Sequence, residues 1–261
     1  VLVFDLEDAV APAEKEAARA QLLQALAQGG YGGRELVVRV NGPGTPWYEH
    51  DLAAMATAPV HSVCLPKVEC PADVSQTLRL LEQAGAGDEL VLWVMAETPT
   101  GVFNIREIAA ADPRIDAIMM GTSDLATELR ARHTTDRQPF LFALSQCVMA
   151  AREAGLDIID GVHLALDDAA GLAAVCQQGR ELGFDGKSLI HPKQIDAANA
   201  AFAPTQAQRK HAERLINAWR EAERQDKAVL VLDGKLVENL HVREAERLLA
   251  LAAAIEGLAQ A

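Results

Sequence analysis

The feature that most constrains the fold is a regular alternation of short apolar runs and helical patterns. Runs rich in Val, Ile and Leu lie at 1–6, 35–40, 60–65, 90–95, 115–120, 156–159 and near 184–189. They are typical of parallel strands that are buried on both faces. Amphipathic helical patterns lie between them; two begin at Pro12 and Pro71 and end at glycines. The alternation predicts an α/β fold with a parallel sheet.

The first run opens the sequence without a Met or a polar lead-in, so we expect that one strand is missing before Val1. With that strand added, the pattern predicts an eight-stranded (β/α)8 TIM barrel. The alternative is an open, doubly wound sheet. No G-x-G-x-x-G follows a predicted strand, so the sequence gives little support for dinucleotide binding.

The pattern changes after residue 203, which predicts two parts: a β/α barrel at 1–203 and a C-terminal helical extension at 204–261. The extension is expected to begin with a capping box at Thr205 and Gln208. An apolar helical stripe follows, formed by Ala212, Leu215, Ile216 and Trp219. A short β-like stretch at 229–232 and a helix at about 242–255 complete it. We expect this extension to act as a lid on the barrel or to reach a neighbouring subunit.

Composition excludes several classes of partner. Lys and Arg number 24 against 37 Asp and Glu, and the formal net charge is −13. This charge argues against binding to nucleic acid or to an anionic membrane surface. No apolar run approaches the roughly 18 residues of a membrane span, and no signal segment is recognisable. The four cysteines lack C-x-x-C spacing. We therefore expect a cytoplasmic protein with free thiols.

Charged residues follow the predicted strands, where β/α barrels carry their active sites. They are Glu7 and Asp8, Arg39, Lys67, Glu97 and Asp124. Glu97 and Asp124 follow neighbouring strands, and two carboxylates without a paired His or Cys favour Mg²⁺. The alternative is that each carboxylate caps a helix or pairs with a nearby base.

The other candidates each have two interpretations. Glu7 and Asp8 would hydrogen-bond the waters of the metal, or stabilise the N-terminus of the helix near Pro12. Arg39, flanked by valines, would bind a substrate carboxylate or an enolate oxygen, or form a structural ion pair. His191, after the last strand, would contact substrate or lie in the core.

Six motifs occur in order along the chain: VFDLEDAV at 3–10, VRVNG at 38–42, LPKVE at 65–69, AETPTG at 96–101, MGTSDL at 120–125 and KSLIHPKQI at 187–195. Together they resemble the citrate lyase β-subunit (CitE-like) family, within the HpcH/HpaI aldolase group that includes malyl-CoA and citramalyl-CoA lyases. The resemblance covers essentially the whole chain. It implies a (β/α)8 barrel, assembled as a homotrimer or as a multiple such as a hexamer.

The resemblance also implies roles for individual residues. Glu97 and Asp124 match the Mg²⁺ ligands of the family, and Arg39 matches the arginine that binds oxygen atoms of the substrate. Glu7, Asp8 and Lys67 match residues that line the pocket. His191 ends the segment where the thioester carrier, either CoA or an acyl carrier protein, is accommodated.

The C-terminal segment departs from the family pattern. Relatives typically carry a catalytic aspartate there, followed soon by proline; this chain has Glu238 in that place and Leu240 where the proline stands. A carboxylate is kept, but the additional methylene changes its reach. A general base misplaced by about 1 Å can lose on the order of a hundredfold in rate.

The resemblance predicts a Mg²⁺-dependent carbon–carbon lyase acting on a citryl-, citramalyl- or malyl-type acyl thioester. Its products would be an acyl thioester and a 2-oxo acid (oxaloacetate, pyruvate or glyoxylate). Arg39 would stabilise the developing charge, and Glu238 is the candidate acid that protonates carbon. The alternative is a metal- and thioester-binding subunit of a citrate lyase complex, without lyase activity of its own.

Overall fold

The computed structural model describes residues 1–225, 227 and 229–260. The chain forms two compact units, Val1–Ala201 and Phe202–Ala261, and each is considered by itself. Among the described residues, no helix is both long enough and apolar enough to cross a membrane.

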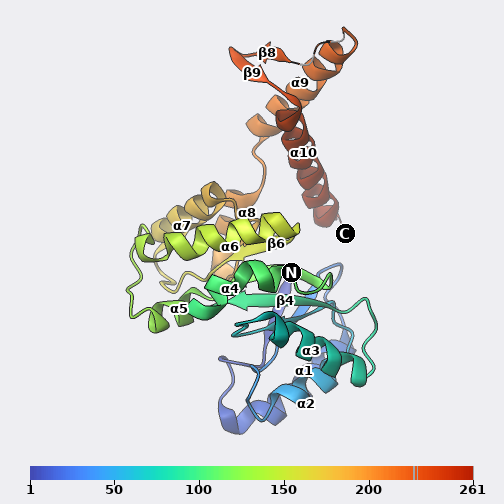
Figure 1. Cartoon of the computed structure of the whole chain (residues 1–261), viewed down its shortest axis with the longest axis vertical. Helices are drawn as coiled ribbons and strands as arrows, with labels where there is room; N and C mark the ends of the chain where they lie inside the picture. The colour runs from blue at the N-terminus through green and yellow to red at the C-terminus, as the bar shows by residue number, and fades with distance from the viewer. Residues whose placement is uncertain (226, 228, 261) are drawn as a thin grey trace. The chain divides into compact units, whose positions relative to one another are not determined.

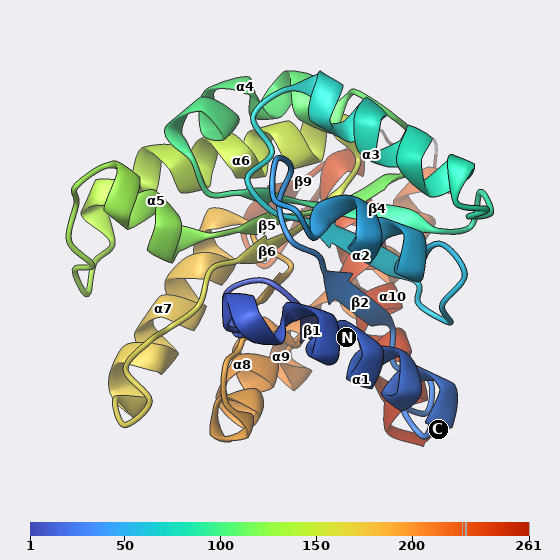
Figure 2. The same cartoon turned by 90° about the horizontal axis from the view of Figure 1, so that it is seen from below.

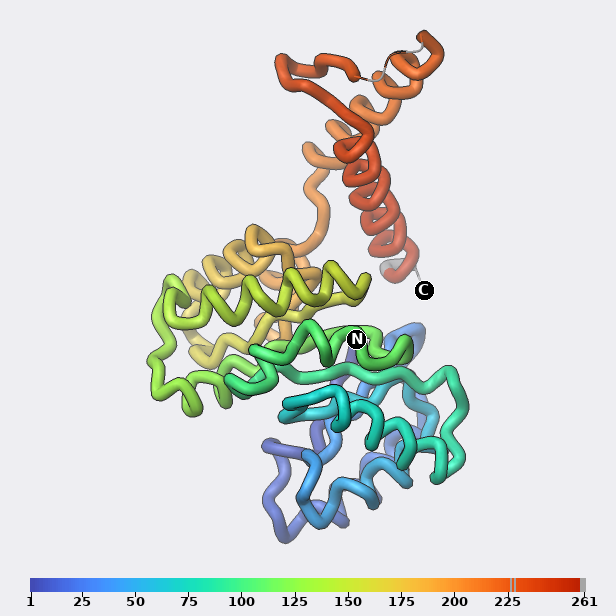
Figure 3. The backbone as a smooth tube through the Cα atoms, viewed as in Figure 1, coloured from blue at the N-terminus to red at the C-terminus, as the bar shows by residue number. Residues whose placement is uncertain are grey.

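The first unit is built on a parallel sheet of seven strands, which follow one another in space in chain order. The strands are β1 (Leu2–Asp5), β2 (Leu36–Arg39), β3 (Ser62–Leu65), β4 (Val91–Ala96), β5 (Ile115–Met120), β6 (Asp157–Asp160) and β7 (Gly186–Lys187). The colour of the tube in Figure 3 follows the residue number and lets the chain be traced through this unit from its N-terminus. The prediction of a parallel α/β fold is confirmed.

Helices connect the strands (Figure 1). They are α1 (Lys15–Gln28), α2 (Tyr48–Met55), α3 (Pro71–Gln83), α4 (Pro99–Ala109), α5 (Thr122–Glu128), α6 (Leu141–Ala154), α7 (Ala169–Leu182) and α8 (Ile195–Phe202). Three short 3-10 helices are η1 (Pro12–Glu14), η2 (Gln138–Phe140) and η3 (Pro192–Gln194). Proline occupies the first turn of α3 and α4, where its missing N–H costs no helical hydrogen bond.

Strands β1 and β7 are the two ends of the sheet, and the described residues do not pair them with each other. The closed eight-stranded ring that the sequence predicts is therefore not shown. The sequential strand order also lacks the reversal that defines a doubly wound sheet. The sheet is therefore a curled half-barrel of seven parallel strands in chain order.

The two faces of the sheet differ in their surroundings. Helices α3, α4 and α6 lie over the outer face of the central strands (Figure 2), where Val63, Leu92 and Ile118 are fully buried. The inner face carries a cluster of Val37, Cys64, Trp93, Met95, Ala117 and Met119. Since side chains alternate along a strand, Arg39 and Glu97 lie on the inner face, two residues beyond Val37 and Met95.

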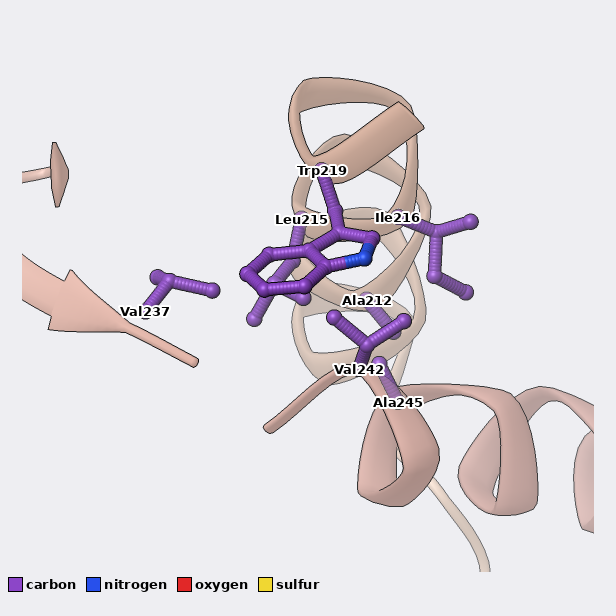
Figure 4. Close-up of a cluster of buried hydrophobic side chains, with 7 residues drawn as sticks. All are labelled: Ala212, Leu215, Ile216, Trp219, Val237, Val242 and Ala245. Atoms are coloured by element: carbon purple, nitrogen blue, oxygen red, sulfur yellow. The ribbon is translucent and has the colours of Figure 1, made fainter. Parts of the chain in front are cut away.

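The second unit contains α9 (Gln206–Glu223), an antiparallel hairpin of β8 (Leu230–Leu232) and β9 (Lys235–Val237), and α10 (Asn239–Gln260). The predicted capping box at Thr205 and Gln208 is confirmed. Trp219 lies between the hairpin and the start of α10, beside Val237 and Val242 (Figure 4). The hairpin turns at Asp233 and Gly234, both with positive φ, as a two-residue hairpin turn requires.

Candidate active site

Charged side chains gather where strands β1 to β5 end. Arg39 forms an ion pair with Glu7 and another with Asp8. Lys67 pairs with Glu7 and Asp124, and its backbone N–H donates to Glu97. The structure thus joins six of the residues predicted from the sequence: Glu7, Asp8, Arg39, Lys67, Glu97 and Asp124.

Arg39 is held by carboxylates on two sides. Its Nε and Nη2 donate to the two oxygens of Asp5, at 2.8 and 2.6 Å. Its Nη1 lies 3.0 Å from Glu7 Oε2 and 3.3 Å from Asp8 Oδ2. Burial disfavours the charged guanidinium, but the hydrogen bonds and charge of Asp5 outweigh burial and raise the pKa of Arg39. The ion-pair interpretation is confirmed; substrate binding by the same residue stays a prediction.

Lys67 links two carboxylates through different parts of the same residue. Its backbone N–H donates to Glu97 Oε1 at 2.8 Å, and its Nζ lies 2.8 Å from Glu7 Oε1. The same Nζ is 3.5 Å from Asp124 Oδ2. The φ of Lys67 is 53°, a left-handed conformation that is uncommon for a residue other than glycine. This conformation directs both donors of Lys67 toward the acidic residues.

Glu97 is the most buried carboxylate of the group, with 2% of its surface exposed. Burial raises its pKa to about 7, and the negative charges of Glu7 and Asp124 add to this effect. Gly121 makes room for its side chain, since a Cβ at that position would lie 2.3 Å from Glu97 Oε2. The glycine of the MGTSDL motif therefore permits the close approach of β4 and β5 ends.

Two further acids of the site, Glu7 and Asp124, differ in their surroundings. The pKa of Glu7 is raised because burial outweighs the favourable contacts with Lys67 and Arg39. Asp124 Oδ2 is buried without a hydrogen-bond partner, although Lys67 Nζ lies nearby. A buried carboxylate oxygen without a hydrogen bond is costly unless another group compensates for it.

The charge balance and the donor chemistry fit a divalent cation. Five carboxylates (Asp5, Glu7, Asp8, Glu97 and Asp124) surround two cations, Arg39 and Lys67. Within the described ranges, no three His, Cys, Asp or Glu residues are grouped as a complete metal site. Mg²⁺ usually takes only one or two carboxylates and fills its octahedron with water or substrate oxygens. Glu97 and Asp124 fit that pattern.

Two predicted site residues lie outside this network. His191 is exposed, which makes the core interpretation wrong; its Nδ1 accepts a hydrogen bond from the Lys193 backbone at 3.1 Å and caps η3. Glu238 is exposed between β9 and α10 of the second unit, and its backbone N–H donates to His241 Nδ1. Contact of His191 with substrate and catalysis by Glu238 stay predictions.

Asp5 is a member of the network to which the sequence analysis assigned no role. It ends β1 directly opposite Arg39, the last residue of β2, in the parallel register. Its oxygens also accept hydrogen bonds from the backbone of Glu7 and Ala9. The sequence feature that could have indicated this pair is that Asp5 and Arg39 lie near the ends of two neighbouring predicted strands.

A parallel α/β sheet whose charged side chains gather at its carboxyl edge is typical of β/α-barrel enzymes, which carry their active sites there. The chain belongs to the HpcH/HpaI aldolase/citrate lyase family, whose model matches residues 1–192. The predicted family resemblance is thereby confirmed.

Individual relatives cover nearly the full chain. It is 48% identical to a (3S)-malyl-CoA thioesterase of Cereibacter sphaeroides (strain ATCC 17029 / ATH 2.4.9), across 97% of this chain and 87% of the relative. It is 37% identical to citrate lyase subunit beta of Leuconostoc mesenteroides subsp. cremoris, across 96% and 85%. Among solved structures, the chain is similar to protein CitE from Mycobacterium tuberculosis, whose crystal structure is a complex with magnesium, acetoacetate and coenzyme A. The two sequences are 31% identical, and the TM-score is 0.78 over 97% of this chain and 90% of that one.

Proposed function

We propose that this chain is a Mg²⁺-dependent enzyme that cleaves a malyl-, citramalyl- or citryl-type acyl thioester. The observation that carries the proposal is the grouping of Glu97, Asp124 and Arg39 at one edge of the sheet, linked through Lys67 and Glu7. Two carboxylates suit a divalent cation, and an arginine suits a carboxylate or enolate. The similar CitE structure contains magnesium, acetoacetate and coenzyme A.

Glu97 and Asp124 would hold the Mg²⁺. When bound, the ion supplies positive charge that favours ionisation of a substrate hydroxyl next to a carboxylate. Lys67 keeps Glu97 oriented through its backbone N–H. Asp124 Oδ2 accepts no hydrogen bond, although Lys67 Nζ lies 3.5 Å away, and it would serve as the second ligand.

The first candidate reaction is cleavage of a carbon–carbon bond. A base takes the proton of the substrate hydroxyl, and the C–O bond becomes the carbonyl of a 2-oxo acid. The neighbouring carbon–carbon bond breaks, and its electron pair passes to the enolate of the acyl thioester. Arg39 would bind the oxygen on which this charge collects. A carboxylic acid must then protonate the enolate carbon, and Glu238 is the predicted donor. The products would be oxaloacetate, pyruvate or glyoxylate together with the acyl thioester.

The second candidate is hydrolysis of the thioester bond. The higher identity to proteins named (3S)-malyl-CoA thioesterase than to citrate lyase subunits favours it, at 48% against 37%. The replacement of the family's aspartate by Glu238 also favours hydrolysis, because hydrolysis needs no acid to protonate carbon. Water would attack the thioester carbonyl, releasing a free thiol and a carboxylic acid.

A third role, as a subunit that binds metal and thioester for a citrate lyase complex, follows from the similarity to citrate lyase subunit beta. Under this proposal the chain would need an acyl carrier protein and further subunits for turnover. Assembly as a homotrimer or hexamer, and a cytoplasmic location, also belong to the proposal.

One assay separates these reactions. The purified chain would be incubated with Mg²⁺ and (3S)-malyl-CoA, citramalyl-CoA or citryl-CoA, and both 2-oxo acid and free thiol would be measured. Carbon–carbon cleavage yields 2-oxo acid without free thiol, whereas hydrolysis yields free thiol without 2-oxo acid. Activity that appears only after addition of carrier protein identifies the complex subunit. If EDTA left full turnover, the metal-dependent proposal would be wrong.

A further inference from the structure

Asp5 and Arg39 form a two-point ion pair inside the site. Arg39 Nε donates to Asp5 Oδ1 at 2.8 Å and Nη2 donates to Oδ2 at 2.6 Å. The side chains are only 16% and 22% exposed, so water competes little for these contacts. A pair with two parallel hydrogen bonds fixes the plane of the guanidinium as well as its position.

The pair follows directly from the sheet. Asp5 and Arg39 are register partners at the last positions of β1 and β2, and neighbouring strands are held about 4.8 Å apart by their backbone hydrogen bonds. Their side chains leave the same face of the sheet at the same level. The guanidinium is therefore anchored to the rigid sheet rather than to a loop.

The pair also determines which edge of Arg39 is turned away from Asp5. A guanidinium has five N–H donors. Asp5 occupies Nε and one donor of Nη2, which leaves Nη1 and the outer donor of Nη2. Nη1 lies 3.0 Å from Glu7 Oε2 and 3.3 Å from Oδ2 of the exposed Asp8. A substrate oxygen bound at this edge would therefore share Nη1 with Glu7 and Asp8.

We propose that Asp5 is a positioning residue: it aligns Arg39 so that the Nη1 and Nη2 edge meets the oxygen atoms of a carboxylate or enolate. This inference rests on the proposed function, because it concerns how that substrate is bound. Asp5 acts through Arg39 and is not assigned any contact with the reacting atoms.

Asp5 also has a structural role in the loop after β1, which is separate from its contact with Arg39. Its oxygens accept hydrogen bonds from the backbone N–H groups of Glu7 and Ala9, so it also shapes the loop that follows β1. Loss of Asp5 would then harm the protein through the loop, independently of Arg39. A double-mutant cycle separates the two roles, because only residues that act together show non-additive effects.

The test uses the full chain with Asp5→Asn, Arg39→Lys and the double variant. Calorimetry in the presence of Mg²⁺ would give the Kd of pyruvate and oxaloacetate, and assays on the best thioester would give kcat and KM. We expect Asp5→Asn to weaken 2-oxo acid binding by about tenfold or more, as for loss of a charge-assisted pair. In the Arg39→Lys background the same change should have less than about a twofold effect.

Glu153→Gln is the matched control. Arg106 donates to Glu153 from the same two atoms, Nε and Nη2, at 2.7 and 2.6 Å, but this pair is exposed on α4 and α6. Its loss should leave Kd, kcat and KM unchanged. Asp5→Glu should not restore binding fully, since the additional methylene shifts the guanidinium.

Two results would overturn the inference: Asp5→Asn binding the 2-oxo acid as tightly as the unmodified chain, or the same fold-loss with and without Arg39. If the unmodified chain neither binds a 2-oxo acid nor cleaves a thioester, the proposed function fails together with this inference. If the unmodified chain is active and Asp5→Asn behaves like it, only the role of Asp5 is lost.

Discussion

Two carboxyl groups of the site lie in surroundings that disfavour their charged form relative to water. Glu97 is buried among negative charges, and Asp124 keeps an oxygen without a hydrogen bond. Each of these costs free energy in the absence of a compensating cation. The arrangement is understandable if binding of a divalent ion supplies the compensation.

The first prediction concerns metal affinity. Glu97→Gln or Asp124→Asn removes one of only two proposed anionic ligands, so either change should abolish detectable Mg²⁺ binding in calorimetry. The Tm of the metal-free protein should not fall below that of the unmodified chain, since neither change breaks the packing of the sheet. Full affinity in both variants would place the metal elsewhere.

The second prediction concerns pH. Glu97 has an ordinary pKa of 4.5 and a value of about 7 in the folded chain. The folded state therefore keeps this proton at pH values where the unfolded state releases it. The carboxyl should lower the stability of the metal-free protein as pH rises from about 4.5 to 7.

Thermal unfolding in EDTA from pH 4.5 to 8 would measure this effect as the difference between the unmodified chain and Glu97→Gln. Mg²⁺ affinity should increase over the same range and level off above pH 7, because only the carboxylate binds metal. A Tm difference that does not vary with pH would contradict the assignment.

The sequence could predict most of the site at this scale because charged residues follow parallel strands, whose carboxyl ends meet. Glu97, Asp124, Arg39 and Lys67 were found by that rule. The role of Asp5 was not, since the partner of a strand-end residue depends on the register between β1 and β2. The positive φ of Lys67 was also out of reach, because lysine itself carries no signal for it.

At the scale of elements, the loop after β3 is packed against the start of α4. Thr98 caps this helix by accepting a hydrogen bond from the Gly101 N–H. A Cβ on Gly101 would lie 2.3 Å from the carbonyl oxygen of Val68, next to Lys67. The helix and the loop that carries Lys67 can approach so closely only because residue 101 has no side chain.

The third prediction is that Gly101→Ala displaces this loop. The clash involves backbone, so we expect a loss of stability of about 1–3 kcal/mol, as for other overpacked positions. Mg²⁺ affinity should fall as well, because the Lys67 N–H would no longer hold Glu97. Denaturant unfolding and calorimetry measure the two effects.

Gly33→Ala provides the comparison, since nothing lies within 4 Å of a Cβ at this loop position. It should change neither quantity. If Gly101→Ala matched Gly33→Ala in both measurements, the packing of α4 against the loop would have no bearing on the site.

The elements themselves were largely predictable. The apolar runs located β1 to β6 to within two residues, and the glycine and proline signals located α1 and α3. Two elements were less accessible. Strand β7 lies within the run predicted near 184–189, but it has only two residues, so its limits could not be read from the pattern. Strand β9 was not predicted, because it has three residues of which Leu236 is exposed.

At the scale of the whole molecule, the question is whether the second unit takes part in chemistry. Glu238 lies at the junction of β9 and α10, and the cluster around Trp219 holds that junction in place. Val237, the residue before Glu238, is the buried member of this hairpin. The sequence predicted the order of the strands correctly. It could not show whether the first and last strands pair to close a barrel, and in the described residues β1 and β7 do not pair.

The fourth prediction is that Glu238→Ala lowers kcat for carbon–carbon cleavage of the acyl thioester by on the order of a hundredfold, as for loss of a general acid. Binding of Mg²⁺ and of 2-oxo acid should be unaffected. The exposed Glu246→Ala on α10 is the matched control and should retain full turnover. Unchanged kcat in Glu238→Ala would exclude this carboxylate from catalysis.

The left-handed backbone of Lys67 has a consequence for the size of ion that the site would accept. Glu97 contacts the main chain of this residue and Glu7 contacts its side chain, so a shift of one carboxylate is passed to the other. Ca²⁺ needs oxygens at about 2.3–2.6 Å, whereas Mg²⁺ needs them at about 2.0–2.1 Å. A wider coordination sphere would push Glu97 outward and disturb Glu7 and its partner Arg39. Discrimination by ionic radius would then be exerted by residues that never touch the metal.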